Sequence, residues 1–346
     1  MDERRRKRSR RHGAATCAAL AFALSALLVP AGAVSAPDPG GETQLLVPVG
    51  KAIGVKLFAE GVLVVGLSEN EGAVSPAKKG GMKAGDLILT MNDVTIGSTE
   101  HLQSLLAENG EREAAFGVRR GGRLVKLAVC PKKGQDGVCR LGAWIRDSMA
   151  GIGTVTYYDP ATGAFGALGH GITDGDTMAL MPFGSGSILP STVKAVKKGS
   201  SGSAGELRGN FDLSGDLGPL CANTDCGIFG TLPADCTLAA GEALPVGDAV
   251  EGPATIRANV SGDEVREYAV EILKRLPNAS DGREMVISVT DPDLIAATGG
   301  IVQGMSGSPI LQNGKLVGAV THVLLSDATK GYGISMETML NAGENV

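Results

Sequence analysis

Short apolar runs separated by glycine recur along the chain beyond residue 140. Runs of this length, bounded by turn residues, predict β-strands. Many short strands at such spacing predict a β-barrel or sandwich assembly. Helix is a minor component, with candidates at Pro292 to Ala297 and Met336 to Leu340. The strand-like runs are Gly153 to Tyr158, Phe165 to Gly169, Ser187 to Val196, Gly227 to Leu232, Ala254 to Val260, Glu267 to Leu273, Met285 to Val289, Pro309 to Leu311, Leu316 to Leu325 and Gly331 to Ile334.

A different pattern precedes this region and predicts a separate small unit over residues 45–131. The run Leu57 to Leu67 is apolar and branched, which is typical of a buried strand. Ser75 to Leu89 predicts a short helix, a glycine turn and a strand, and Ser98 is placed to cap a further helix. Polar segments at 37–44 and 132–139 are interpreted as linkers, which leaves 140–346 as a second domain.

The first 36 residues predict export. Seven basic side chains lie within Met1 to Gly13, an apolar run follows from Ala14 to Val34, and Ala31, Ala33 and Ala36 are small residues suited to cleavage. The segment is interpreted as a signal peptide or as a signal anchor that stays in the membrane with its basic end inside. Either way, the rest of the chain is expected to work outside the cytoplasm.

Charge and cysteine content narrow the function classes. Beyond Gly13 the chain carries 25 basic and 35 acidic side chains, so it lacks the basic balance that phosphate binding requires, and no nucleic-acid partner is expected. Five cysteines lie outside the export segment, and disulfides are compatible with an exported protein. A zinc site is the alternative, but the chain has no C-x-x-C pair and no histidine near these cysteines. We expect no metal and no cofactor.

The stretch Thr298 to Ile310 holds the candidate nucleophile. Ser306 lies in a G-x-S-G-x-P turn, and flanking glycines allow the backbone to present one hydroxyl together with nearby amides. The Gly304 and Ser306 amides are the expected oxyanion donors. A serine hydroxyl needs a base, and His170 and His322 are the candidates within the second domain. His170 is favoured because glycines on both sides leave its ring accessible, whereas His322 lies inside a predicted strand.

The acid is less determined by the residues themselves. Asp291 follows a strand and precedes Pro292, a pattern equally typical of a helix N-cap with proline at the first helical position. Asp174, Asp176 and Asp293 are competitors. With Asp291 chosen, the order His170, Asp291, Ser306 matches that of a known serine-protease template.

Two resemblances extend this interpretation. The run Gly81 to Ile96, G-M-K-A-G-D-L-I-L-T-M-N-D-V-T-I, resembles the helix-turn-strand of bacterial PDZ domains. Such domains bind an extended peptide at a sheet edge and receive its terminal carboxylate in a loop of backbone amides. The resemblance implies that this loop lies near Ile53, Gly54 and Val55, with a peptide or a terminal segment of this chain as ligand. If these glycines are only turn residues, the unit is a spacer.

The second domain resembles the stage IV sporulation protein B peptidases. The matching motifs are Arg146 to Thr154, Gly166 to His170, Asn223-Thr224 with Gly227 to Gly230, and Thr298 to Ile310 with Gly318 to Val323. This resemblance implies a mainly β protein, with a small α+β PDZ domain followed by a trypsin-like double β-barrel peptidase domain. It assigns His170, Asp291 and Ser306 as the catalytic triad. Only 15 residues separate Asp291 from Ser306, which is fewer than the usual trypsin-like layout has.

The resemblance also implies a biological role. Such a peptidase is exported across the forespore membrane into the intermembrane space during endospore formation. There it cleaves itself and a membrane-associated regulator of an intramembrane protease, which leads to activation of a sigma factor. Two alternatives remain open at this point: a non-catalytic PDZ adaptor or sensor of the envelope, and a general envelope quality-control serine protease.

Overall fold

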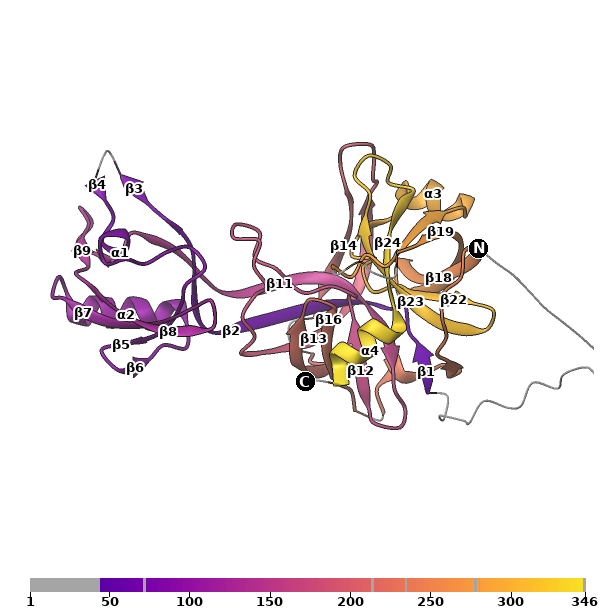
Figure 1. The fold of residues 1–346 in the computed structure, drawn as a ribbon, viewed down its shortest axis with the longest axis horizontal. Helices are drawn as coiled ribbons and strands as arrows, with labels where there is room; N and C mark the ends of the chain where they lie inside the picture. Colours follow the sequence, from indigo (N-terminus) through magenta and orange to yellow (C-terminus); the bar gives the residue numbers. More distant parts are fainter. Residues whose placement is uncertain are drawn as a thin grey trace, which may run out of the picture. The chain divides into compact units, whose positions relative to one another are not determined.

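The computed structural model describes residues 44–70, 73–212, 215–233, 235–276, 279 and 281–344. The predicted export segment 1–36 and nearly all of the linker after it lie outside the described residues. Two six-stranded barrels and a PDZ-like part make up what is described (Figure 1). The predicted mainly β fold, with a PDZ-like part and a double β-barrel, is thereby confirmed.

Six strands close the first barrel through antiparallel pairing, and each neighbour in the ring is hydrogen-bonded to the next. Buried side chains such as Ile53, Val155 and Phe165 fill its interior. Two short strands, β1 (Leu45–Pro48) and β17 (Leu244–Pro245), extend the sheet beside β11. The ring order is β2 (Ala52–Leu67), β11 (Ala143–Tyr158), β12 (Ala164–Ala167), β16 (Gly227–Thr231), β15 (Gly218–Thr224) and β13 (Ser185–Lys197).

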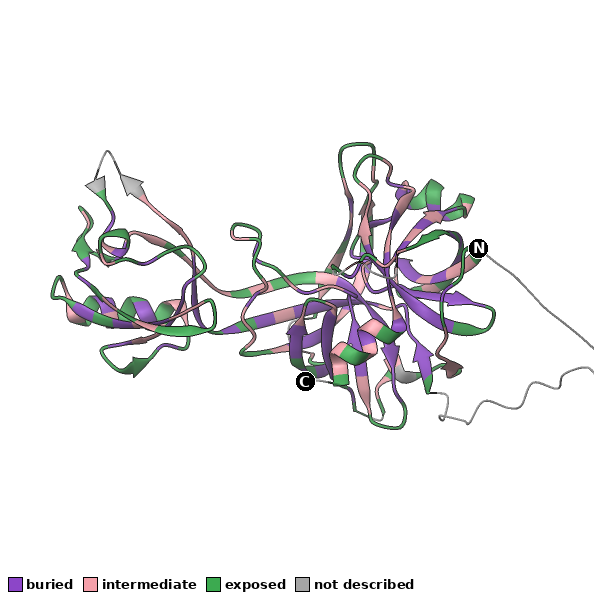
Figure 2. Cartoon of the chain, viewed as in Figure 1, coloured by how far each residue is buried: buried purple, intermediate pink, exposed green. Residues whose placement is uncertain are grey.

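The second barrel is also closed, and its core contains Ile256, Ile287, Ile310 and Val320. The strands Pro309–Gln312 and Lys315–Val323 of this barrel are largely buried, whereas Glu264–Arg275 has many exposed residues (Figure 2). Outside the ring lie α3 (Pro292–Thr298), β21 (Val302–Gln303) and α4 (Met336–Glu344), while β14 (Gly205–Phe211) pairs with both β13 and β21. The ring order is β18 (Gly252–Ser261), β19 (Glu264–Arg275), β20 (Met285–Val289), β24 (Lys330–Ser335), β23 (Lys315–Val323) and β22 (Pro309–Gln312).

The PDZ-like part lies in the chain between β2 and β11. Ser98 caps α2 as predicted, Ser75 caps α1, and Asn92 and Asp93 form a hairpin turn with positive φ. Its core includes Val64, Ile88 and Phe116. Its elements are β3 (Glu69–Asn70), β4 (Ala73–Val74), α1 (Pro76–Lys79), β5 (Leu87–Met91), β6 (Val94–Thr95), α2 (Thr99–Asn109), β7 (Ala114–Arg120), β8 (Arg123–Val129), β9 (Lys132–Lys133) and β10 (Cys139–Arg140).

Strand β2 belongs to the barrel and to the PDZ-like part at once, which corrects the predicted boundary at residue 45. Its first half pairs with β11 on one side and with β13 on the other, and its residues Val62 and Leu63 pair with β5. The PDZ-like part is therefore an insertion between two neighbouring strands of the first barrel, rather than a domain that precedes it.

The predicted carboxylate-binding loop at Ile53, Gly54 and Val55 is wrong for the same reason. These residues lie within β2, opposite Gly151 to Gly153 of β11 and Ile188 to Pro190 of β13. Ile53 and Val55 are buried in the barrel core. A strand hydrogen-bonded on both sides has no free edge to receive a peptide.

Among the described residues, the cysteines form no disulfide and no metal-binding cluster is present. Cys130, Cys139, Cys221, Cys226 and Cys236 are all free thiols there, and no group of three side chains suited to a metal ion occurs. In the same part of the chain, no helix has the length and apolar character needed to cross a membrane.

Candidate active site

A cavity of about 1440 Å³ is lined by residues of both barrels. His170 reaches it from the loop after β12 of the first barrel. Ser306 reaches it from the turn between β21 and β22 of the second. The two residues favoured from the sequence as base and nucleophile therefore share one cavity, although 136 positions separate them in the chain.

Ser306 lies in a turn whose shape depends on glycine. Gly304 has a φ of +98° and Gly307 a φ of +96°, values that disfavour residues with a side chain. The Ser306 hydroxyl donates a hydrogen bond of 2.7 Å to the Thr321 carbonyl. The turn is closed by the Ser308 amide, which donates to the Met305 carbonyl, and by the Gly307 amide, which donates to the Val320 carbonyl. The amides of Gly304 and Ser306 belong to this turn, and their role as oxyanion donors stays a prediction.

The hydrogen bond of His170 fixes its tautomer. Nδ1 lies 2.9 Å from the Gly171 carbonyl oxygen, and since a carbonyl only accepts, Nδ1 carries the proton. In the neutral ring Nε2 is then the free acceptor, which is the form a general base needs. Burial lowers the pKa of His170 below the ordinary histidine value, because the charged ring would lose its hydration.

His322 lies in the same cavity and stacks beside His170. The ring centroids are 5.0 Å apart, with an angle of 37° between the rings. Burial, followed by the nearby His170 and Arg283, lowers the pKa of His322 to about 4. Its Nδ1 is buried without a hydrogen-bond partner in the described structure. His322, which the sequence places inside a strand, therefore also reaches the cavity of the favoured base.

Asp291 caps α3 and does not meet His170 in the described structure. Its Oδ1 accepts the amides of Asp293 and Leu294, each at 3.0 Å, and its Oδ2 accepts the Ala269 amide at 3.2 Å. Pro292 begins the helix, and Gly299 ends it in the left-handed conformation. The N-cap alternative noted for this residue is thus what the structure has. Asp293 is exposed in the first turn of the same helix.

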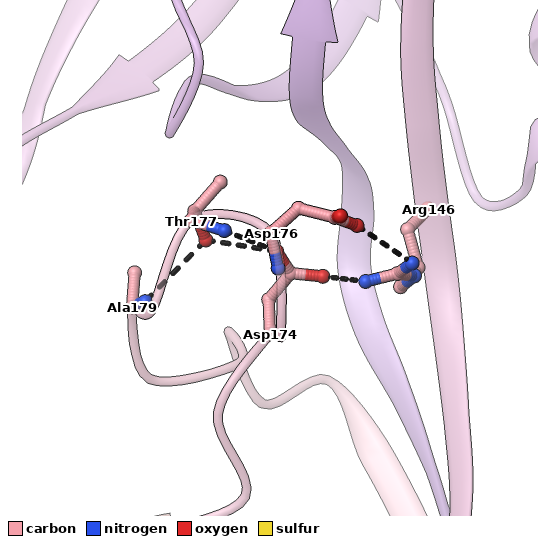
Figure 3. A network of polar contacts seen from close by, with 5 residues as sticks. All are labelled: Arg146, Asp174, Asp176, Thr177 and Ala179. Carbon is pink, nitrogen blue, oxygen red and sulfur yellow. Dashed lines mark hydrogen bonds and ion pairs between the residues drawn. The ribbon is translucent and has the colours of Figure 1, made fainter.

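The other two acid candidates serve the loop that follows His170. Asp174 is buried and forms an ion pair with Arg146 of β11, and it also accepts the Thr177 amide and hydroxyl (Figure 3). Asp176 pairs with the same guanidinium at 3.0 Å. Both carboxylates therefore bind this loop to β11, and neither has a hydrogen bond to His170 within the described residues.

The chain matches one known protein family over most of its second domain. A family model for the SpoIVB peptidase S55 matches residues 137–340. The chain belongs to this family. A PDZ domain model matches residues 70–120 of the S55 peptidase. The chain is accordingly a serine peptidase with a PDZ domain.

Solved structures similar to the S55 peptidase are distant from it in sequence. The PDZ domain of the SdrC-like protein from Listeria monocytogenes is 16% identical, with a TM-score of 0.22, and the match covers 25% of this chain and 87% of that chain. The active form of the Rv3671c protease from M. tuberculosis is 14% identical, with a TM-score of 0.31 and coverage of 57% and 74%. Its inactive form is 15% identical, with a TM-score of 0.29 and coverage of 55% and 81%. A search of curated proteins found no match.

Asp281 and Arg283 of the S55 peptidase site were not singled out from the sequence, and Asn223 was named only within a matching motif. Asn223 accepts the Ile172 amide at 2.8 Å and donates to the carbonyls of Ile172 and Met181, so it fixes the chain after His170. Asp281 and Arg283 line the cavity, and the Arg283 guanidinium lies 5.3 Å from the ring centre of Tyr332. A buried amide at a strand end signals such a role for Asn223, whereas no local pattern marks Asp281 or Arg283.

Proposed function

We propose that this S55 peptidase is an endopeptidase in which Ser306 is the nucleophile, His170 the general base and Asp291 the acid that orients it. The observation that carries the proposal is the convergence of Ser306 and a neutral His170 on one cavity, from separate barrels. A serine hydroxyl becomes an effective nucleophile only when a base takes its proton.

The reaction needs a rearrangement of the Ser306 side chain. Its hydroxyl turns from the Thr321 carbonyl toward Nε2 of His170, which takes the proton as Oγ attacks the scissile carbonyl. The negative charge that develops on the substrate oxygen is stabilised by the amides of Gly304 and Ser306. His170 then returns the proton to the leaving amine as the peptide bond breaks, and water that His170 deprotonates hydrolyses the acyl group from Ser306. The arrangement described above is, on this proposal, a resting one.

The role proposed for Asp291 rests on its T-D-P motif ahead of T-G-G-I and on the family resemblance. In the resting arrangement its carboxylate is held by three backbone amides. Orientation of His170 by Asp291 therefore requires a second arrangement, in which the carboxylate leaves at least one of these amides and Nδ1 of His170 leaves the Gly171 carbonyl.

The biological setting is proposed from the same resemblance. The peptidase is exported across the forespore membrane during endospore formation, and its N-terminal segment holds it at the membrane or is removed. Its substrates are the chain itself and a membrane-associated regulator of an intramembrane protease, and cleavage of that regulator leads to sigma-factor activation. No cofactor takes part in this proposal.

A peptide ligand of the PDZ-like part is proposed at the edge of β11 rather than at Ile53 to Val55. Residues Ala143 to Arg146 of β11 pair with β2 on one side only, within the described residues. Helix α2 lies beside this region, since the Asp147 carboxylate accepts the Thr99 amide at 2.7 Å, and Ile145 and Leu105 pack against the same cluster. A free strand edge next to a helix suits an added peptide strand.

Labelling with a fluorophosphonate tests the catalytic assignment. The probe should modify Ser306 of the full chain, and modification should be lost in Ser306→Ala and His170→Gln. Ser308→Ala is the matched control, because Ser308 lies in the same turn with a buried hydroxyl that has no partner. Absence of labelling in the folded wild type would favour the adaptor alternative. Broad cleavage of unfolded proteins would instead favour quality control.

A further inference from the structure

Thr154 of β11 lies where the base segment and the nucleophile turn meet. Its amide donates to the Ser306 carbonyl at 3.0 Å, and its hydroxyl donates to the Gly304 carbonyl at 2.8 Å. Its own carbonyl accepts the Leu168 amide at 3.1 Å, two residues before His170. One residue thus contacts both catalytic segments through three separate hydrogen bonds.

Burial makes these bonds hard to replace. Thr154 is 1% exposed, so water is not available to satisfy the Gly304 carbonyl if the hydroxyl is removed. The packing is also close, because a side chain at Gly307 would contact the Thr154 carbonyl and the Leu168 amide. The nucleophile turn therefore rests directly on β11 at this residue.

Both contacted segments contain residues with positive φ. Gly304 and Gly307 have positive φ, and Leu168 has a φ of +70°, which is uncommon for a residue with a branched side chain. Thr154 binds the carbonyls of Gly304 and Ser306. The Gly304 amide lies in the peptide unit just before the Gly304 carbonyl, and the Ser306 amide lies in the unit between the two carbonyls. A rotation of the turn would change where these amides point.

We propose that Thr154 is a positioning residue for the peptidase reaction, and that its hydroxyl sets the orientation of the Gly304 to Ser306 turn relative to the His170 segment. This inference rests on the proposed function, because it assigns the turn to the nucleophile and the oxyanion donors. Thr154 does not touch the substrate. It holds the Gly304 to Ser306 turn and the His170 segment, which come from different barrels, at a fixed distance from each other.

The test compares three variants by fluorophosphonate labelling rate, peptide hydrolysis and thermal unfolding. Thr154→Val removes the hydroxyl at nearly constant shape, and Thr154→Ser keeps it. Thr156→Val is the matched control, since Thr156 lies on the same strand and its buried hydroxyl has no partner. We expect Thr154→Val to lower kcat and the labelling rate by ~10-fold or more with little change in KM, because small misplacements of reacting groups are costly. Thr154→Ser should restore most of the rate, and Thr156→Val should match the wild type.

A folded Thr154→Val variant that labels Ser306 at the wild-type rate would overturn the inference. So would equal losses in Thr154→Val and Thr156→Val, since these would reflect general packing. If Thr154→Val does not fold, Thr154→Cys provides the same comparison, because a thiol of similar size donates only weakly. Failure of the proposed function itself is distinguishable, since the wild type would then not be labelled at all.

Discussion

The Asp291 carboxylate accepts three backbone amides, and two of them begin α3. That helix leads through Gly299 and Gly300 directly into the nucleophile turn. A residue in this position affects the site in two ways: through the start of the helix, and through the orientation of His170 that we propose. The two effects are separable by substitution, because an asparagine can cap a helix but cannot carry the negative charge that stabilises an imidazolium.

Asp291→Asn and Asp291→Ala should therefore differ. The alanine variant loses the cap and should be less stable by ~1 kcal/mol. The asparagine variant keeps the bonds to Asp293 and Leu294 and should be destabilised less, while kcat falls by roughly 100-fold or more, as expected for impaired general base catalysis. Urea unfolding and peptide hydrolysis measure the two effects. Full activity in Asp291→Asn would remove Asp291 from the triad and leave it as the cap of α3.

At the scale of elements, the sequence predicted local structure better than strand partners. The helix after Ser75, the cap at Ser98 and the helix after Asp291 each depend on a few adjacent residues, and all are present. The partners of β2 depend on residues about a hundred positions away, in β11 and β13, which no local pattern reveals. For this reason the sequence predicts a PDZ loop at Ile53 to Val55, where the structure has a barrel strand. His170 and Ser306 share one cavity, and this was predictable only because a serine nucleophile requires a base nearby.

Insertion of the PDZ-like part between β2 and β11 leads to a prediction about two shortened chains. Leu63 lies opposite Arg146, so replacing residues 64–145 with Asn-Gly should close β2 and β11 as a tight hairpin. This chain should unfold cooperatively and label at Ser306, but it should lose binding of extended peptides. A chain of residues 140–346 alone lacks β1 and β2, leaves edges of β11 and β13 unpaired, and should not fold.

Circular dichroism, thermal unfolding and fluorophosphonate labelling distinguish the two chains. A cooperative transition and labelling in the 140–346 chain would contradict the insertion topology. Peptide binding that persists after removal of residues 64–145 would place the ligand site away from the β11 edge.

At the scale of the whole molecule, the site lies at the meeting of two barrels. His170 comes from the first barrel and His322 from the second, and their rings are 5.0 Å apart. Thr154, from the first barrel, holds the Ser306 turn of the second. The site therefore forms only when the two barrels associate. A charge introduced between the two rings affects both the association of the barrels and the site.

The pH dependence of stability should report this shared position. Burial lowers the pKa of His170, and it lowers that of His322 from 6.5 to about 4, so the unfolded chain binds more protons than the folded one in between. The stability that the neutral His322 ring contributes is therefore complete above pH 6.5 and is lost as the pH falls from about 6.5 to about 4, and the lowered pKa of His170 acts in the same direction. His322→Gln removes one of the two protonations, and its free energy of unfolding should decline less over this window than that of the wild type. Urea unfolding at pH 7, 5.5 and 4.5 measures the difference, with His101→Gln, in α2 outside the cavity, as the control. Equal declines in the wild type and His322→Gln would show that protonation of His322 does not oppose the joining of the barrels.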